Sequence, residues 1–166
     1  MRQTILHCPG IQVLNKYGFA EIRQNILTKQ HSLHATTPFN KGKILCLFSA
    51  MQVYTEPNPL TVQTGIRSHI TLLPEFLKYT NHSCEPNIFF NTTSMELIAL
   101  KRIDKNEELC FFYPSTEWEL AQPFYCYCGS IECLQNVKGA KYLLPAQIKK
   151  YAFTDFIKHE LQHTNL

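Results

Sequence analysis

The chain has 166 residues, of which 45% are hydrophobic and 17% charged, with a formal net charge of +3. This composition excludes a disordered chain and predicts one globular domain that is long enough to bury a core. No apolar run approaches the roughly 18 residues that span a bilayer, so we expect no membrane segment, and the small basic excess gives no reason to expect direct nucleic-acid binding.

Short apolar runs predict many brief strands in the first two thirds of the chain. The predicted strands cover residues 11–14, 17–22, 33–35, 44–48, 61–64, 69–72, 88–91, 95–100 and 109–113. Two of them, 44–48 and 109–113, are apolar on both faces and are expected to be buried. Turns are expected at residues 15–16, at Gly42 with a positive φ, and at residues 92–94, which join their flanking strands into a hairpin.

The C-terminal part of the chain has a different pattern. Residues 116–119 have the spacing of a capping box, which predicts a short helix. Residues 143–161 place apolar side chains at helical spacing, which predicts one or two helices broken near Pro145. Strands and helices do not alternate, so a doubly wound sheet is excluded and the sequence predicts a mainly β fold with a C-terminal helical extension.

A dense polar run, Asn-His-Ser-Cys-Glu-Pro-Asn at residues 81–87, lies between two apolar segments. Its Glu-Pro-Asn part also suits an ordinary surface turn. A run in which every residue can bond to a ligand or to the backbone, placed between core-forming segments, instead favours a site at a junction of strands. The cysteines help to choose between these interpretations.

The N-terminus has no apolar segment of signal-peptide length, so we expect an intracellular protein, cytoplasmic or nuclear, whose seven cysteines are thiols or metal ligands. Cys126, Cys128 and Cys133 have a C-x-C-x4-C spacing that lets three thiolates reach one metal ion. An open fourth position would suit hydrolytic zinc chemistry, and a fourth thiolate, for which Cys84 is the natural candidate, would close a structural site. The remaining cysteines are expected to be small buried hydrophobes: Cys8, Cys46 and Cys110.

These motifs resemble those of SET-domain protein lysine methyltransferases. Residues 81–87 match the family's N-H-S-C-x-P-N signature, and residues 107–113 resemble its E-E-L-x-F-D-Y motif. Residues 126–133 match the zinc element called post-SET, and residues 35–44 resemble the segment that leads into the family's K-G-E-x-I turn. The motifs occur in the family's order, and the resemblance covers roughly residues 10–135.

The resemblance implies a SET-domain fold, in which short curved β-sheets surround a pseudoknot formed beside the signature. It divides the chain into a SET domain at residues 1–123, a post-SET zinc segment at 124–136 and a helical tail at 137–166. The tail is expected to cover an apolar edge or to mediate self-association.

The resemblance also implies S-adenosylmethionine-dependent methyl transfer to the ε-amine of a lysine in a protein substrate, a histone or another protein. Tyr113 would lie at the transfer point, and Phe111 would set the number of methyl groups, which favours di- or trimethylation. The cofactor-binding residues would be Ser32, Leu33, Lys78, Tyr79, Asn81, His82, Tyr113 and Leu134. One structural zinc ion would be bound by Cys84, Cys126, Cys128 and Cys133.

Elementary chemistry agrees with this function. Methyl transfer to an amine is an in-line displacement that needs a neutral, well-aligned amine and no nucleophilic side chain. An apolar aromatic channel lowers the pKa of a lysine from about 10.4 by desolvation, and aromatic faces favour a cationic sulfonium. Tyr113 precedes Pro114 at the end of an apolar run, where its hydroxyl can reach a cleft. Candidate aromatic residues are Phe89, Phe90, Phe111, Phe112, Tyr113, Phe124 and Tyr125.

Two departures from the family pattern leave other functions open. Gln30-His31-Ser32 stands where the family has G-x-G, or else Lys16-Tyr17-Gly18 does in a second alignment, and Phe112 replaces the Asp of the F-D-Y motif. One alternative is therefore a SET-like module that binds a peptide without chemistry. Another is a methyltransferase that acts on a non-histone or small-molecule amine.

Overall fold

The computed structural model describes residues 10–164, so Cys8 lies outside the described residues. The N-terminal sheet is antiparallel and contains β1 (Ile11–Tyr17), β2 (Ala20–Asn25) and β3 (His31–Ala35), in that order. The predicted turn at residues 15–16 is wrong, because β1 bulges after Val13 and continues through both residues. Tyr17 instead pairs with Ala20, which places the turn at the two residues between them.

The central sheet has the order β4 (Ile44–Leu47), β10 (Glu96–Ala99) and β9 (Ile88–Asn91). The predicted hairpin of β9 and β10 is confirmed, as is the positive φ of Gly42, which is 81°. The strand predicted at 44–48 forms, but its predicted burial is wrong. Ile44 is 42% exposed and Leu47 68% exposed, since β4 is an edge strand.

A third sheet has the order β5 (Ser49–Tyr54), β7 (Ser68–Leu73) and β6 (Val62–Gly65). The two predicted strands in this region are confirmed as β6 and β7. β5 was not predicted, and it is a largely exposed edge strand. After β7 a 3-10 helix, η1 (Glu75–Tyr79), leads into the polar run at residues 81–87.

The polar run begins with β8 (Asn81–His82), which pairs in parallel with β11 (Cys110–Phe111). The strand predicted at 109–113 is shorter than expected because a 3-10 helix, η2 (Tyr113–Ser115), begins at Tyr113, and Pro114 has no N–H for a strand ladder. The helix predicted at 116–119 is absent from the described chain. Its Thr116 hydroxyl donates back to the Tyr113 carbonyl at 3.3 Å instead of capping a new helix.

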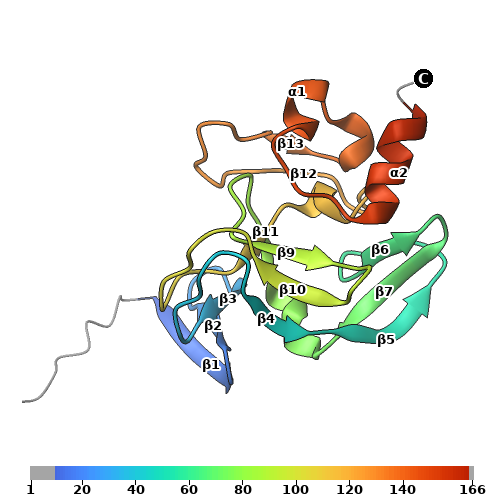
Figure 1. Cartoon of the computed structure of the whole chain (residues 1–166). Coiled ribbons are helices and arrows are strands. Elements are labelled where there is room, and N and C mark those ends of the chain that lie inside the picture. The colour runs from blue at the N-terminus through green and yellow to red at the C-terminus, as the bar shows by residue number, and fades with distance from the viewer. Residues whose placement is uncertain (1–9, 165–166) are drawn as a thin grey trace, which may run out of the picture.

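The C-terminal segment contains β12 (Phe124–Tyr125), β13 (Asn136–Val137), the 3-10 helix η3 (Ala140–Tyr142), α1 (Pro145–Ile148) and α2 (Asp155–Thr164). Two helices are thus confirmed, with Pro145 as the first residue of α1. In Figure 1 the helices cover the side of the molecule opposite the β1–β2–β3 sheet, with β9, β10 and β11 between them. No helix in residues 10–164 is long and apolar enough to cross a membrane.

Two apolar cores meet at β11. Phe111 packs in the main core with Phe90 and other side chains of the sheets, whereas its neighbour Phe112 packs with residues of the tail. The tail core contains Phe112, Ala140, Phe153, Ile157 and Leu161. The mainly β fold with a helical extension is confirmed, and the extension shares its core with Phe112, the residue that follows β11.

Candidate functional site

The polar run at residues 81–87 is built against a segment that is almost thirty residues further along the chain. Asn81 lies opposite Cys110, and His82 lies opposite Phe111, in the parallel β8–β11 pair. The Ser83 amide extends this pair by donating to the Phe111 carbonyl at 3.0 Å. The run is therefore a junction of strands and not a plain surface turn.

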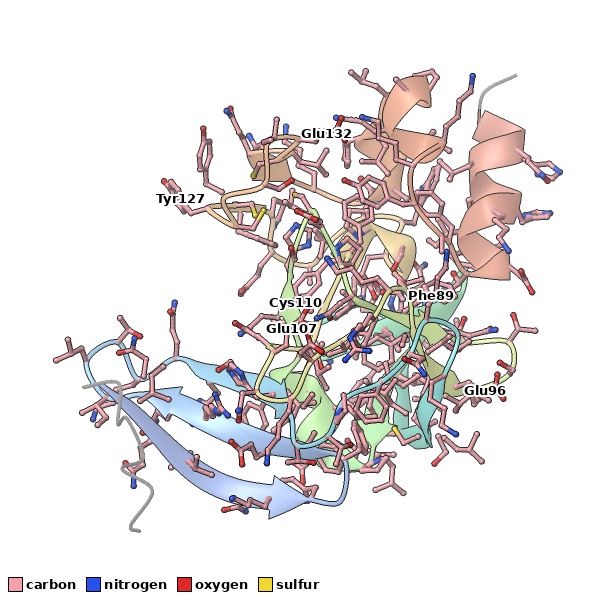
Figure 2. The ribbon with its side chains drawn as sticks, turned by 60° about the vertical axis from the view of Figure 1, so that its left-hand side comes forward. Phe89, Glu96, Glu107, Cys110, Tyr127 and Glu132 are labelled. Atoms are coloured by element: carbon pink, nitrogen blue, oxygen red, sulfur yellow. The ribbon has the colours of Figure 1, made fainter. Side chains whose placement is uncertain are left out.

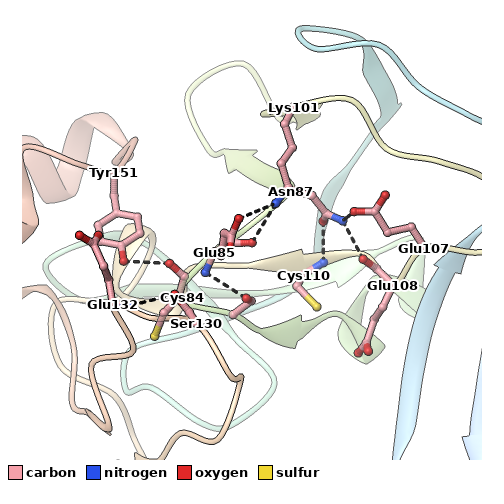
Figure 3. Close-up of polar contacts among 11 residues, drawn as sticks. Cys84, Glu85, Asn87, Lys101, Glu107, Glu108, Cys110, Ser130, Glu132 and Tyr151 are labelled. Carbon is pink, nitrogen blue, oxygen red and sulfur yellow. Dashed lines mark hydrogen bonds and ion pairs between the residues drawn. The ribbon is translucent and has the colours of Figure 1, made fainter.

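Asn87 locks the end of the run to the segment before β11. Its side-chain oxygen accepts the Cys110 N–H at 2.9 Å, and its Nδ2 donates to the Glu108 carbonyl at 2.7 Å and to Glu107 Oε1 at 3.0 Å (Figure 3). Figure 2 shows Glu107 and Cys110 close together between the N-terminal sheet and the C-terminal segment. Because its amide is fully engaged, Asn87 holds the scaffold together.

His82 connects the polar run to Tyr113. Its Nδ1 accepts the Tyr113 N–H at 3.2 Å, and its ring lies edge-on to the rings of Tyr113 and Phe124, with centroids 5.2 and 5.5 Å away. Burial lowers the pKa of His82 to about 4, which keeps the imidazole neutral and its Nδ1 free to accept. His82 thus positions the backbone from which the Tyr113 side chain extends.

Tyr113 lines a cavity of about 350 Å³. The cavity has apolar walls that include Leu77, Phe90, Phe111 and Phe124. The Tyr113 hydroxyl donates to the Thr80 carbonyl at 3.2 Å, and burial raises its pKa to about 12, so the phenol stays protonated. A cavity with these walls suits an alkyl chain that ends in a group able to meet a phenol oxygen.

The four cysteines predicted to bind metal come together. The sulfur atoms of Cys84, Cys126, Cys128 and Cys133 all lie within 4.8 Å of one another. Thiolates at about 2.3 Å from a tetrahedral zinc ion are about 3.8 Å apart, so this donor set fits one closed four-thiolate site. The Leu134 N–H donates to Cys84 Sγ at 3.3 Å, which fastens the cysteine loop to the polar run.

The other cysteines differ from expectation. Within the described residues Cys46 and Cys110 are only partly buried, because each lies in a short strand next to polar segments. Tyr127 and Glu132 lie at the outer side of the loop that carries the clustered cysteines (Figure 2). The spacing of the clustered cysteines therefore separated them correctly from the remaining thiols.

The first group of predicted cofactor residues lies where β3 meets β8. Asn81 Nδ2 donates to the His31 carbonyl at 2.9 Å and to Glu108 Oε1 at 2.8 Å, and the His31 ring is 4.9 Å from that of Tyr79. Ser32 follows His31 in β3, so the Gln30-His31-Ser32 segment lies beside the polar run. Gly18 of the second alignment belongs to the β1–β2 turn instead.

The remaining predicted cofactor residues are spread around this junction. Lys78 lines the cavity, and its ammonium pairs with Glu75 at 2.6 Å. Leu33 is fully buried in the main core, and its carbonyl accepts the Leu109 N–H at 2.7 Å. Leu134 lies beside Cys84, on the cysteine side of His82.

Two residues of the site were not predicted. Glu117 lies in the cavity wall, although the sequence pattern assigned it to a capping box. Tyr151 of the tail stacks on Phe112 with ring centroids 3.7 Å apart, and its hydroxyl donates to the Cys84 carbonyl at 2.9 Å (Figure 3). Phe112 stands where the F-D-Y motif has an Asp. This replacement was the sequence signal that could have indicated an aromatic partner such as Tyr151.

The parallel pairing of the polar run with residues 110–111, joined to a four-cysteine cluster, defines a SET-type domain with a post-SET cysteine element. The chain belongs to the SET-domain family, whose SET domain matches residues 30–114. This match covers every strand from β3 to β11 as well as Tyr113, and it confirms the predicted fold.

Similar proteins include named methyltransferases. The chain is 38% identical over 100 residues to "Methyltransferase flvH" of Aspergillus flavus, a match that covers 59% of this chain and 56% of that protein. It is 30% identical over 103 residues to "Histone-lysine N-methyltransferase, H3 lysine-36 specific" of Kluyveromyces lactis, covering 58% of this chain and 14% of that protein. The chain thus spans about half the length of the first relative and a small part of the second.

Among solved structures, the methyltransferase domain of human Histone-lysine N-methyltransferase SETMAR is similar with a TM-score of 0.46 and 18% identity. The likeness covers 75% of this chain and 56% of that one.

Proposed function

We propose that this protein transfers a methyl group from S-adenosylmethionine to the ε-amine of a lysine in a protein substrate, in an intracellular setting that is cytoplasmic or nuclear. The observation that carries the proposal is the position of Tyr113, in the wall of an aromatic cavity and hydrogen-bonded through its backbone to His82 of the polar run. The names of two relatives, one a methyltransferase and one a histone-lysine N-methyltransferase, support the same reaction and substrate class.

The residues present fit the cofactor in part. Asn81 Nδ2 donates to the His31 carbonyl, His82 accepts the Tyr113 N–H, and Leu134 donates to Cys84 Sγ. These groups would hold S-adenosylmethionine, which supplies an electrophilic methyl group on a cationic sulfur when bound. Side chains at residues 30–32 keep the backbone further from a ligand than glycine would, so the affinity for the cofactor is the weaker part of this fit.

The cavity accounts for the activation of the amine. Methyl transfer needs an unprotonated amine, and apolar walls favour that form because they do not solvate an ammonium ion. Phe111 and Tyr113 have ring centroids 4.6 Å apart, and Phe90 lies 4.8 Å from Phe111. Phe111 offers no hydroxyl to tie down the amine, so the amine can rotate between transfers, and we expect di- or trimethylated product by mass spectrometry.

Tyr113→Phe tests the proposal. We expect at least a tenfold loss of labelled methyl transfer, because the variant removes the hydroxyl that lies at the transfer point, with little change in S-adenosylmethionine affinity by calorimetry. Tyr125→Phe is the matched control, since Tyr125 is 51% exposed and outside the cavity lining. Full activity of the Tyr113 variant would remove this tyrosine from the mechanism. Substrates should include histones, ribosomal proteins and free lysine.

A peptide-binding module without chemistry is the second candidate. It is favoured by Gln30-His31-Ser32, which stands where close approach to the cofactor calls for glycine. Calorimetric titration of the zinc-loaded protein with S-adenosylmethionine separates the two, because only the enzyme requires saturable binding of the methyl donor.

A further inference from the structure

One carboxylate lies in the wall of the aromatic cavity. Glu117 is 5% exposed, and it follows directly after η2, which carries Tyr113. The other charged residue of the lining, Lys78, is already paired with Glu75. Within residues 10–164 no cationic side chain pairs with Glu117, so this carboxyl group has no counter-charge in the cavity when it is ionised.

Glu117 is held in place through one of its two oxygens. Its Oε1 accepts the Gln63 backbone N–H at 2.9 Å and the Thr116 hydroxyl at 3.2 Å. Gln63 in turn accepts the Trp118 N–H through its side-chain oxygen at 2.9 Å. In the described chain no hydrogen bond reaches Oε2, so this oxygen keeps its capacity to accept.

A second polar group of the same cavity lacks a partner. Thr80 is 3% exposed and lines the cavity, and its hydroxyl has no hydrogen-bond partner among the described residues. Buried hydroxyls are nearly always bonded, so an unbonded one in a cavity wall indicates a missing donor or acceptor. An ammonium group donates up to three hydrogen bonds, and acceptors such as Glu117 Oε2 and the Thr80 hydroxyl oxygen can each take one.

Burial of an unpaired carboxylate is costly, and it raises the pKa of Glu117 to about 8. A cation in the cavity would stabilise the ionised form. Aromatic walls also favour a cation through their π faces, and Phe111, Tyr113 and Phe124 supply such faces.

We propose that Glu117 is the cation-binding residue of the substrate cavity and selects an alkylammonium chain over a neutral chain of the same shape. This inference rests on the proposed function, and it adds a specificity determinant to the cavity beside its aromatic walls. The amine then enters as an ion pair, and its proton passes to the Glu117 carboxylate before the neutral amine reacts.

Binding of the cation requires an ionised Glu117 and a protonated amine, so it is expected to be strongest between about pH 8 and the amine's own pKa of about 10. Other titratable neighbours do not change in this window. Tyr113 ionises near 12, and Lys78 has its pKa raised through its bond to Glu75. His69 of β7 pairs with Gln63 of β6. Burial lowers the pKa of His69, so its imidazole stays neutral in this pH window.

The test is equilibrium binding of n-butylammonium and of 1-butanol to the zinc-loaded full chain at pH 9, followed by NMR. Glu117→Gln keeps the acceptor for Gln63 and removes the charge. We expect it to weaken n-butylammonium binding at least tenfold and to leave 1-butanol binding unchanged. Glu117→Asp keeps the charge and should retain part of the preference for n-butylammonium over 1-butanol. Glu119→Gln is the control, because Glu119 is half exposed and pairs with Lys141.

Equal binding of n-butylammonium to wild type and Glu117→Gln, or no binding to wild type, overturns the inference. Methyl transfer by the wild type is measured separately. If methyl transfer occurs but n-butylammonium binding does not depend on Glu117, this inference fails and the proposed methyltransferase activity stands. If ammonium binding depends on Glu117 but no amine in the panel is methylated, the inference holds for a binding module and the enzyme is excluded.

Discussion

The two ends of the described chain differ in how they relate to the site. β1, at the N-terminal end, lies on the edge of its sheet, and six of its seven residues are exposed. The tail at residues 137–164 follows the cysteine motif closely in sequence, and Ile157 is fully buried there, with Phe153 and Leu161 also buried. The N-terminal strand is therefore largely exposed, whereas the C-terminal tail belongs to the buried structure that supports the site.

The contacts of Tyr151 explain the difference. Its ring covers Phe112, next to Tyr113, and its hydroxyl donates to the carbonyl of Cys84, a member of the four-cysteine cluster (Figure 3). The tail therefore packs against the four-cysteine cluster and against Phe112, which stands where the family motif has an Asp.

Zinc removal should give the largest difference in behaviour between the tail and β1. Structural zinc sites supply on the order of 10 kcal/mol of apparent binding free energy, so chelation or Cys84→Ser should loosen residues 124–164. Limited proteolysis should then cleave this segment, while hydrogen exchange in β1 stays near its wild-type rate. Cys46→Ser is the control, since Cys46 lies outside the cluster. Unchanged cleavage after chelation would contradict the four-thiolate site.

The next largest effect is expected at Tyr151. Tyr151→Ala removes both the stack on Phe112 and the bond to Cys84, and should cost about 2–4 kcal/mol of unfolding free energy. Tyr151→Phe keeps the ring and should cost only about 1 kcal/mol, the worth of one hydrogen bond. Chemical denaturation measures both. Equal stability of the Ala and Phe variants would mean that the ring does not support the site.

Sequence patterns predicted the local features of this fold well. The hairpin of β9 and β10, the turn at Gly42 and the cysteine spacing all depend on residues close together in the chain. The stack of Tyr151 on Phe112 joins residues 39 positions apart, and neither residue alone indicates the other. Glu117 was misassigned because Thr116 and Glu119 have capping-box spacing, whereas a tertiary bond from Gln63 determines its conformation. β5 was missed since its apolar side chains are exposed.

Glu117 lies where the cavity meets the tail, because its carbonyl accepts the Ala140 N–H at 2.9 Å. Its pKa is raised from 4.5 to about 8, so the native state holds a proton that the unfolded chain releases. Unfolding free energy should therefore fall as pH rises from about 5 to 8, by up to about 4 kcal/mol at 1.4 kcal/mol per pKa unit. Glu117→Gln should lack this fall in thermal melts at several pH values. If the unfolding free energies of the wild type and of Glu117→Gln change with pH in the same way, the Glu117 carboxylate is in contact with solvent.

The smallest effects are expected in β1. Val13→Ala should change the unfolding free energy by no more than about 0.5 kcal/mol, because Val13 is 43% exposed and gains little from burial. Ile157→Val removes one methylene from the fully buried tail core and should cost about 1 kcal/mol. Ile157→Val would then lower the unfolding free energy more than Val13→Ala, although it removes fewer carbon atoms. If Val13→Ala is the more destabilising of the two, β1 has a partner that covers it, and the contrast between the two ends no longer holds.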